Sequence, residues 1–261
     1  MTASPLILLH GVTMSGRVWD ALVPALSRHH RVLAPTLCGH RGGPPPPHRP
    51  VRIDDLVDDV ERRMDERGWD TAHLAGNSLG GWIAIELARR GRARSVCALS
   101  PAGFWDAGAP SHTGGTSVIS RAALLTRLTR PVAPLGLRSA AVRRTAFRDV
   151  CARGDRLTPR AALGIADDLL DCPILGDVLA TRSQIAPLDP LPCPVTLAWA
   201  ARDRILPISV NGAVARERLP RARFEILGGA GHVPMIDNPR RVVRAILDTT
   251  GALRDDGLSR R

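Results

Sequence analysis

Apolar runs alternate with helical patterns along most of the chain. Strands that alternate with helices indicate a mostly parallel central sheet flanked by helices, so the expected fold class is α/β. Each expected strand is a short run rich in Leu, Val, Ile and Ala, which is typical of buried strands. These runs are Pro5–His10, Arg31–Pro35, Thr71–Gly76, Ser95–Ser100, Pro194–Ala200 and Arg223–Leu227.

Two of the helices between and after these strands have ends that the sequence marks. In residues 53–68, apolar positions recur at helical spacing, acidic residues fill the first half, and arginines and Gly68 follow. The last helix is expected to begin at Asn238, whose side chain can cap it, with Pro239 in its first turn. Gly251 is expected to end it.

Two regions break the alternation. Residues 39–50, GHRGGPPPPHRP, are expected to form a loop, because consecutive prolines exclude helices and interior strands. Residues 105–187 contain helical patterns and no convincing strand, which predicts a helical cap inserted into the core formed by residues 1–104 and 188–251. Residues 252–261 are expected to be a disordered tail. The cap helices are expected at Ser117–Arg130, Arg138–Arg153 and Pro159–Asp171.

Composition adds limits on location and on metal chemistry. The chain has 261 residues, 44% of them hydrophobic, and a mean hydropathy of −0.03, as in globular proteins. No apolar run approaches the roughly 18 residues of a membrane helix, and the first residues do not resemble a signal peptide. We therefore expect a cytoplasmic protein with no membrane partner. The five cysteines are scattered without a CxxC pair, which predicts neither a zinc site nor disulfides.

The charge is strongly positive and unevenly spread. The net charge is +11, the chain has no lysine and no tyrosine, and every basic residue besides histidine is arginine. A codon bias towards arginine explains this without a nucleic-acid partner. Between Ala107 and Arg148, however, there is no acidic residue, while seven arginines occur there: Arg121, Arg127, Arg130, Arg138, Arg143, Arg144 and Arg148.

The clearest chemical motif is Gly76-Asn77-Ser78-Leu79-Gly80, a G-x-S-x-G sequence between an expected strand and an expected helix. Glycines allow the chain to turn sharply there, which would hold the serine oxygen above the edge of the sheet. A glycine-rich turn with an incidental serine is the alternative interpretation.

Three further segments argue against that alternative. The strand ending at His10 leads into a loop where the N–H of Val12, together with that of Leu79, could bind a developing oxyanion. We expect His10 itself to support this loop. Asp203 and His232 each follow an expected strand, so that serine, aspartate and histidine occur in the chain order of a Ser-Asp-His hydrolase triad.

On these residues, the sequence resembles the α/β-hydrolase family over nearly its whole length outside the cap. HGVTMSGRVW, GNSLGG, WAARDRILP and GAGHVPMIDNP resemble the family's oxyanion loop, nucleophile elbow, acid loop and histidine loop. Thr36 stands where the family commonly has an aspartate. The resemblance implies a core sheet of about eight strands.

The expected reaction is hydrolysis of a carboxylic ester or related acyl compound through an acyl-enzyme. Ser78 would attack the carbonyl carbon, His232 would take the serine proton, and Asp203 would orient the imidazole. This chemistry needs no metal and no organic cofactor. The expected partner is a small-molecule acyl substrate, and the protein is expected to be a monomer or a homodimer. The expected pocket residues are Thr13, Met14, Phe104, Trp105 and Val233, with Trp19, Trp82 and Trp199 in the core.

Several alternatives stay open at this point. Asp106 is a second candidate for the triad acid. GNSLGG also resembles the elbow of C–C bond hydrolases that act on ring-cleavage products, whereas a serine nucleophile and the absence of tyrosine argue against epoxide and haloalkane hydrolysis. A non-catalytic ligand-binding protein could share the scaffold.

The cap arginines also have more than one interpretation. They could cover solvated helix faces, attract an anionic substrate, or bind an anionic membrane or nucleic acid. We expect no nucleic-acid partner, because the cap lacks a series of aromatic residues.

Overall fold

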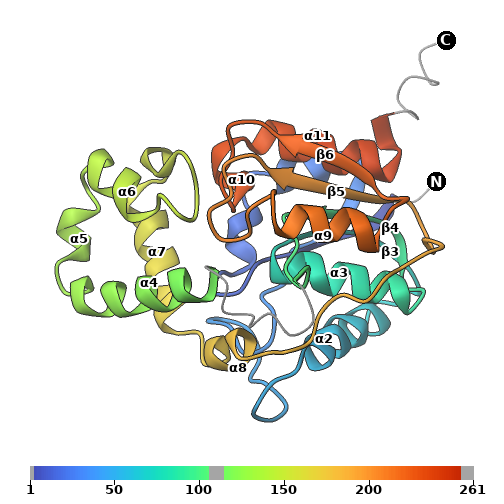
Figure 1. Cartoon of the computed structure of the whole chain (residues 1–261), viewed down its shortest axis with the longest axis horizontal. Helices are drawn as coiled ribbons and strands as arrows, with labels where there is room; N and C mark the ends of the chain where they lie inside the picture. The colour runs from blue at the N-terminus through green and yellow to red at the C-terminus, as the bar shows by residue number, and fades with distance from the viewer. Residues whose placement is uncertain (1–2, 106–114, 254–261) are drawn as a thin grey trace.

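The computed structural model describes residues 3–105 and 115–253, and in these residues six strands form a single sheet. The strand order is β2-β1-β3-β4-β5-β6, and every neighbouring pair is parallel (Figure 1). Asp106 and the tail from residue 254 lie outside the described residues. The strands are β1 (Ser4–Leu9), β2 (His30–Leu33), β3 (Ala72–Asn77), β4 (Ala93–Leu99), β5 (Val195–Ala200) and β6 (Arg223–Leu227).

The sequence therefore predicts every described strand, with ends that differ by at most two residues. The expectation of about eight strands, taken from the family resemblance, is not met by the described residues, whose sheet has six. The α/β fold class is confirmed, and the described sheet is wholly rather than mostly parallel.

Side chains alternate between two apolar cores on the faces of this sheet. Within β1, Ile7 and Leu9 point to one core, whereas Leu6 and Leu8 point to the other, as the period of two in a strand requires. The first core is covered by α2 (Ile53–Asp65), α3 (Leu79–Arg89) and α9 (Asn211–Arg218). The second is covered by η1 (Gly16–Trp19), α1 (Val23–Leu26) and α11 (Pro239–Thr250).

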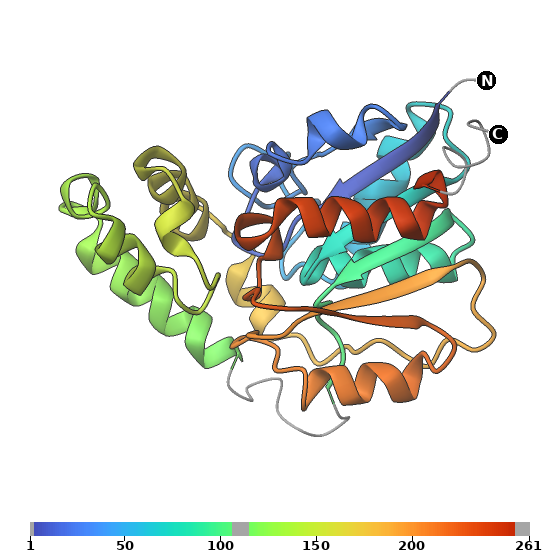
Figure 2. The same cartoon turned by 90° about the horizontal axis from the view of Figure 1, so that it is seen from above.

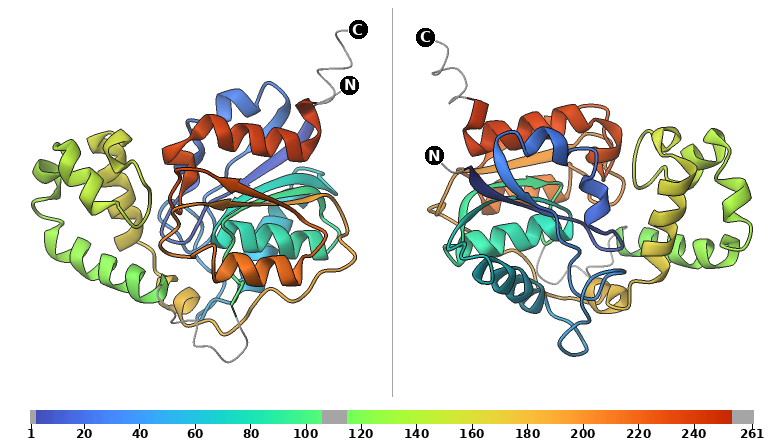
Figure 3. Two further views of the ribbon diagram at one scale, coloured as in Figure 1. Left: turned by 45° about the horizontal axis from the view of Figure 1, so that its top comes forward. Right: turned by 180° about the vertical axis from the view of Figure 1, so that it is seen from behind.

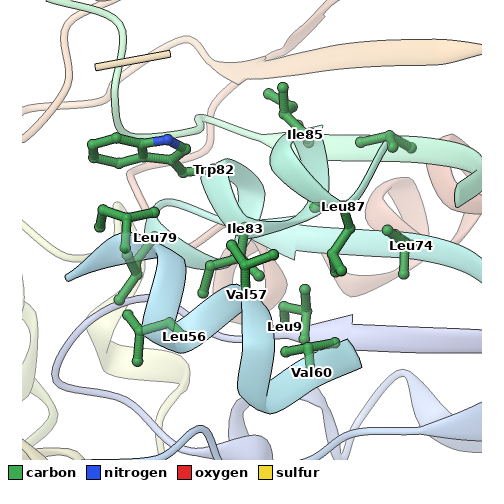
Figure 4. Packing of buried hydrophobic residues seen from close by; sticks show 14 of the residues in the cluster. Leu9, Leu56, Val57, Val60, Leu74, Leu79, Trp82, Ile83, Ile85 and Leu87 are labelled. Carbon is green, nitrogen blue, oxygen red and sulfur yellow. The ribbon is translucent and has the colours of Figure 1, made fainter. Parts of the chain in front are cut away.

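The first core shows why the amphipathic pattern of α2 predicts its place. Leu56, Val57 and Val60 of α2 are fully buried and face Ile83 of α3 and Leu9 of β1 (Figure 4). Full burial of such a side chain contributes roughly 1.5–3 kcal/mol. The expected core positions of Trp19, Trp82 and Trp199 are also confirmed, since each is at most 2% exposed.

The ends of α11 follow the sequence signals. The side chain of Asn238 accepts a hydrogen bond from the N–H of Arg241 at 3.2 Å, which caps the helix at its start. Gly251 ends it in the left-handed conformation, with φ of +82°.

Between β4 and β5, the described residues form helices and loops with no strand. We call α4–α8 (residues 115–179) the helical insertion; it stands at one side of the α/β core (Figures 2 and 3). It lies within the segment expected to be the cap. Its elements are α4 (Gly115–Thr129), α5 (Ala133–Gly136), α6 (Ala140–Ala146), η2 (Gly154–Arg156), α7 (Pro159–Leu170) and α8 (Leu175–Leu179).

One buried carboxylate of the helical insertion holds α7 against the core. Asp168 is 4% exposed, and its Oδ2 accepts a hydrogen bond from the hydroxyl of Ser15 at 2.8 Å. Its Oδ1 lies 2.5 Å from the guanidinium of Arg17 and 3.1 Å from that of Arg41. A buried carboxylate needs such partners, because an unpaired charge there would be costly. The contact joins the insertion to the segment that follows β1.

Within the described residues, no helix combines the length and apolar character needed to cross a bilayer.

The turn between β3 and α3 depends on a close approach of backbones at Gly80. A Cβ placed on Gly80 would lie 2.2 Å from the carbonyl oxygen of Leu9, far inside van der Waals contact. We therefore expect Gly80→Ala to lower the free energy of unfolding by more than about 2 kcal/mol, measured by urea denaturation.

The matched control for this prediction is Gly164→Ala within α7, where the new methyl group would meet no atom within 4 Å. Because alanine is the better helix former, this variant should be as stable as the wild type or more stable by about 0.5–1 kcal/mol. Equal stability of Gly80→Ala and the wild type would contradict the packing described for the turn.

Candidate active site

Ser78 lies on a strained turn directly after β3. Its backbone has φ of +53° and ψ of −116°, a region that non-glycine residues rarely occupy. The turn is fixed on both sides, because the Ser78 N–H donates to the Leu99 carbonyl at 3.0 Å and its own carbonyl accepts from Ala102 at 3.0 Å. Strain that the surroundings maintain in this way is found preferentially at functional sites.

The two expected oxyanion donors follow β1 and β3. Leu79 is the first residue of α3, where N–H groups have no acceptor within the helix. Val12 lies in the turn closed by a hydrogen bond from Met14 to Gly11 at 3.2 Å. In the described part of the chain, no acceptor takes the N–H of Val12. Both amides are thus free to meet a ligand oxygen.

His10 supports this loop through hydrogen bonds that fix a single tautomer of its ring. Its Nε2 accepts a hydrogen bond from the N–H of Leu37 at 3.0 Å, so the proton must reside on Nδ1, which donates to the Gly11 carbonyl at 2.8 Å. Complete burial is the main reason why the pKa of His10 is lowered to about 3. Both ring nitrogens are occupied, so His10 holds the loop and is not available as a base.

Asp203 and His232 are paired at the ends of β5 and β6. Oδ2 of Asp203 lies 2.8 Å from Nδ1 of His232, and both side chains are at most 7% exposed. The other carboxylate oxygen accepts hydrogen bonds from the N–H groups of Ile205 and Leu206 at 2.9 and 2.8 Å. A carboxylate held in this way fixes the imidazole with its Nδ1 protonated and leaves Nε2 to act on other groups.

Ser78 and His232 line one cavity of about 80 Å³, which also touches the helical insertion. Of the expected site residues, Val12, Thr13, Met14 and Val233 line it as well. Its walls from α4 are Val118, Ile119 and Ala122, and the remaining lining residues are Gly11, Asn77, Ala146, Asp149, Val150, Leu169 and Ile205.

Two expected pocket residues lie elsewhere, and the prediction for them is corrected. Phe104 is fully buried in the first core, with its ring 6.4 Å from that of Trp199. Trp105 packs its ring edge-on against Trp82 at 5.4 Å, and its indole N–H donates to the carbonyl of Ser183. Proximity to the end of β4 in sequence suggested the pocket, but aromatic packing directs both rings away from it.

Asn77 is a site residue that the sequence reasoning did not single out. Its side-chain amide donates to the carbonyl of Leu99 at 3.1 Å and to that of His232 at 2.9 Å. It therefore ties the loop that carries the histidine to the turn that carries the serine. Its Oδ1 is buried without a partner among the described residues, and the residue lines the cavity. Its place beside Ser78 in GNSLGG was the available signal.

Asp237 is a second residue that sequence reasoning missed, and it connects the histidine loop with the helical insertion. Its Oδ2 accepts from the N–H groups of Gly231 and Ala152 at 2.7 and 2.9 Å, and its Oδ1 accepts from Arg153 at 2.7 Å. The N–H of Val233 adds a bond to the Val150 carbonyl at 2.8 Å. The backbone of 150–153 is thereby held against the loop that positions His232.

These bonds also explain a wrong prediction. The helix expected from Arg138 to Arg153 is shorter in the structure, where α6 spans Ala140–Ala146, and the N–H groups of Ala152 and Arg153 bond to the Asp237 carboxylate in place of helix carbonyls.

Other groups of interest lie away from this chemistry. None of the seven arginines between 107 and 148 lines the cavity, and among the described lining residues only His232 and Asp149 have acidic or basic side chains. Burial raises the pKa of both the Cys97 and Cys151 thiols to about 12, so neither is a ready nucleophile. In the residues described, no group of three or more His, Cys, Asp or Glu side chains could hold a metal ion.

Comparison with known proteins identifies the family. The model of the Alpha/beta hydrolase family matches residues 6–245. The chain belongs to this family. The hydrolase is similar, at 35% identity over 195 residues, to the epoxide hydrolase EphH of Mycobacterium tuberculosis, and the match covers 73% of this chain and 91% of the relative.

Two further similar proteins have names that indicate other reactions. The hydrolase is 30% identical over 256 residues to a pimeloyl-[acyl-carrier protein] methyl ester esterase of Aromatoleum aromaticum, covering 92% and 95% of the two chains. The solved structure of a meta-cleavage product hydrolase of Pseudomonas fluorescens matches with a TM-score of 0.73 at 21% identity, covering 97% and 92%. At that identity the structural match supports the fold alone. Together the comparisons identify an α/β-fold hydrolase.

The lowered pKa of His10 predicts that the folded protein loses part of its stability as the pH falls. The unfolded chain binds a proton at this histidine near pH 6.5, whereas the folded chain does so only near pH 3. Between these values the unfolded state binds more protons, so stability is present above about pH 6.5 and falls as the pH decreases, by up to about 1.4 kcal/mol per pH unit from this residue.

We expect His10→Asn to be less stable at neutral pH, because the Leu37 N–H loses its acceptor. The decisive measurement is the slope of unfolding free energy against pH between 6.5 and 4.5, which should be shallower in this variant. Identical slopes in the variant and the wild type would contradict the assigned protonation of His10.

Asp237→Asn tests the connection between the histidine loop and the helical insertion. An amide NH2 group in place of one carboxylate oxygen would face a backbone donor, which should cost roughly 1–3 kcal/mol of stability. Hydrogen exchange of the amides of Gly231, Ala152 and Arg153 should become faster. The control, Asp70→Asn at an exposed carboxylate, should leave exchange at these three amides unchanged. Unchanged exchange in both variants would refute the role given to Asp237.

Proposed function

We propose that this chain is a serine hydrolase that cleaves a carboxylic ester, or a related acyl compound, through an acyl-enzyme intermediate. The observation that carries the proposal is the pairing of His232 with Asp203 at 2.8 Å, with His232 and the strained Ser78 lining one cavity. A nucleophile, a base and a group that orients the base are the components that acyl transfer requires.

In the proposed first step, His232 takes the proton of the Ser78 hydroxyl as its oxygen attacks the substrate carbonyl. The resulting oxyanion would lie against the N–H groups of Val12 and Leu79, and each such donor contributes roughly 2.7–4 kcal/mol to the transition state in comparable sites. Asp203 stabilises the imidazolium that forms. His232 then protonates the leaving alcohol.

In the second step, water replaces the alcohol. His232 accepts a proton from the water as its oxygen attacks the acyl carbon, and it then gives that proton to the Ser78 oxygen as the bond between this oxygen and the acyl carbon breaks to release the acid. Asn77 keeps the histidine loop beside the serine through both steps, because its side chain bonds the carbonyl of His232. None of these steps requires a metal or a cofactor.

The cavity suggests a small, uncharged acyl group. Its volume of about 80 Å³ is smaller than the roughly 150 Å³ cavity that accepts benzene in another protein. Its walls are largely aliphatic, and no arginine lines it, which does not support the hypothesis that cap arginines bind an anionic acyl substrate directly. We propose a short-chain ester as the substrate class.

Other reactions of the family are alternatives that experiment can separate. The relative named an epoxide hydrolase makes epoxide opening worth testing, although a serine stands at the nucleophile position and the chain has no tyrosine to act as an acid. The GNSLGG elbow keeps C–C bond hydrolysis as a second candidate. A non-catalytic ligand-binding protein would react at Ser78 with a serine-reactive probe such as a fluorophosphonate, but it would turn over no ester.

The test is turnover of p-nitrophenyl acetate and butyrate, with styrene oxide as the epoxide probe. We expect ester hydrolysis in the wild type and its loss in Ser78→Ala and His232→Ala. Asp203→Asn should keep the fold and lower kcat by up to about 10⁴. The exposed Ser27→Ala serves as the control and should be fully active. Ester turnover that survives in Ser78→Ala, or epoxide turnover without ester turnover, would refute the proposal.

A further inference from the structure

The helical insertion carries a group of exposed apolar side chains. We call it the apolar patch, and it consists of Leu124, Leu125, Leu128, Val132 and Leu135, each 61–72% exposed. These are five of the nine large hydrophobic residues found exposed in the described part of the chain. Single exposed leucines are ordinary, but a group of them on neighbouring helices marks an interaction surface.

The leucines of the patch on α4 are exposed to solvent on the projecting insertion. Leu124, Leu125 and Leu128 share one face of α4 because they are spaced one and three residues apart. Of the α4 residues that line the cavity, Val118 and Ala122 lie seven and three residues before Leu125, so the patch continues the helix stripe that begins at the cavity wall. Both α4 and α5 contact α7, and the insertion that they form with it stands at one side of the core (Figures 1 and 2).

Of the arginines in the insertion, Arg130, Arg144 and Arg148 pair with aspartates, whereas others near the patch have no acidic partner among the described residues. Arg121, Arg127 and Arg138 are exposed and have no acidic partner among the described residues. Residues 115–148 contain seven arginines and no aspartate or glutamate. The surface therefore combines apolar side chains with uncompensated positive charge, and its partner should be apolar and negatively charged.

A second copy of the chain fits this surface poorly. A symmetric dimer through the patch would bring the same arginines of the two copies close together, which opposes association. Nucleic acid is negatively charged, but it offers no apolar phase for five aliphatic side chains, and the patch has no aromatic ring on which bases could stack.

We propose that the apolar patch docks the protein on an anionic lipid surface. The leucines enter the boundary between headgroups and acyl chains, and the long arginine side chains reach the lipid phosphates. The insertion projects from the core, and a fluid lipid surface can accept projecting leucines without a complementary pocket (Figure 3). Docking of this kind requires no membrane-crossing helix, and it differs from the sequence-based expectation of no membrane partner.

The test is flotation of the full chain with vesicles of equal parts phosphatidylglycerol and phosphatidylcholine, compared with vesicles of phosphatidylcholine alone. We expect the wild type to float with the anionic vesicles and to be released by high salt. The double variant Leu125→Ser/Leu128→Ser should bind at least tenfold more weakly. Val210→Ser, an exposed apolar position on the core, should bind like the wild type.

A second set of variants tests how much the arginines contribute to binding of the anionic vesicles. Arg121→Gln/Arg127→Gln should weaken binding to the anionic vesicles at least fivefold. Arg28→Gln/Arg244→Gln, at exposed arginines of the core, should have a much smaller effect. Thermal unfolding of each variant shows that the comparison is made between folded proteins.

Three results would overturn the proposal. They are no flotation of the wild type with either vesicle, equal loss in the patch and core variants, and a concentration-dependent dimer that only the leucine variant abolishes. The failure of docking can be distinguished from the failure of ester hydrolysis, because Ser78→Ala should float like the wild type. Loss of turnover with intact flotation would leave the docking surface established.

Discussion

The candidate site depends on one constraint, which is that all described strands run in the same direction. Parallel strands place their carboxyl ends at a single edge of the sheet. β1, β3, β5 and β6 therefore deliver Val12, Ser78, Asp203 and His232 to the same region, although up to 220 residues separate them in sequence. The pairing of Asp203 with His232 requires that β5 and β6 lie next to each other, as they do.

Hydrogen bonds from side chains to the backbone then fix the positions of the loops that carry these residues. Asn77 bonds the carbonyl of His232, and Asp237 gathers three N–H groups from the histidine loop and the helical insertion. The Asp237 bonds are charge-assisted and directional, and together with the Asn77 bond they limit how far the histidine loop can move from the serine. Because Asp237 bonds to both the histidine loop and the helical insertion, movement of the insertion would also displace the loop that carries His232.

The helical insertion has two different surfaces, and each has a different physical role. Residues in the first half of α4 form part of the cavity wall, whereas leucines in its second half are exposed beside arginines. Asp168 and Asp237 hold the insertion to the core at two places, through partners on the segment after β1 and on the histidine loop. The cavity beside Ser78 and the exposed leucines involve different residues, so substitution can alter each without the other.

The sequence by itself determined the local features, because these depend on neighbours along the chain. Hydrophobic periodicity placed all six described strands, Asn238 and Gly251 marked the ends of α11, and the order of Ser78, Asp203 and His232 identified the candidate triad. Only the tertiary structure decided features that depend on contacts across the fold. It packed Phe104 and Trp105 against other aromatic rings, and it bound the backbone of Ala152 and Arg153 to Asp237 in place of a helix. It also revealed that Asn77 bonds to the carbonyl of His232. It also left the leucines of α4 exposed, which periodicity could not reveal, because an apolar face has the same pattern whether or not another surface covers it.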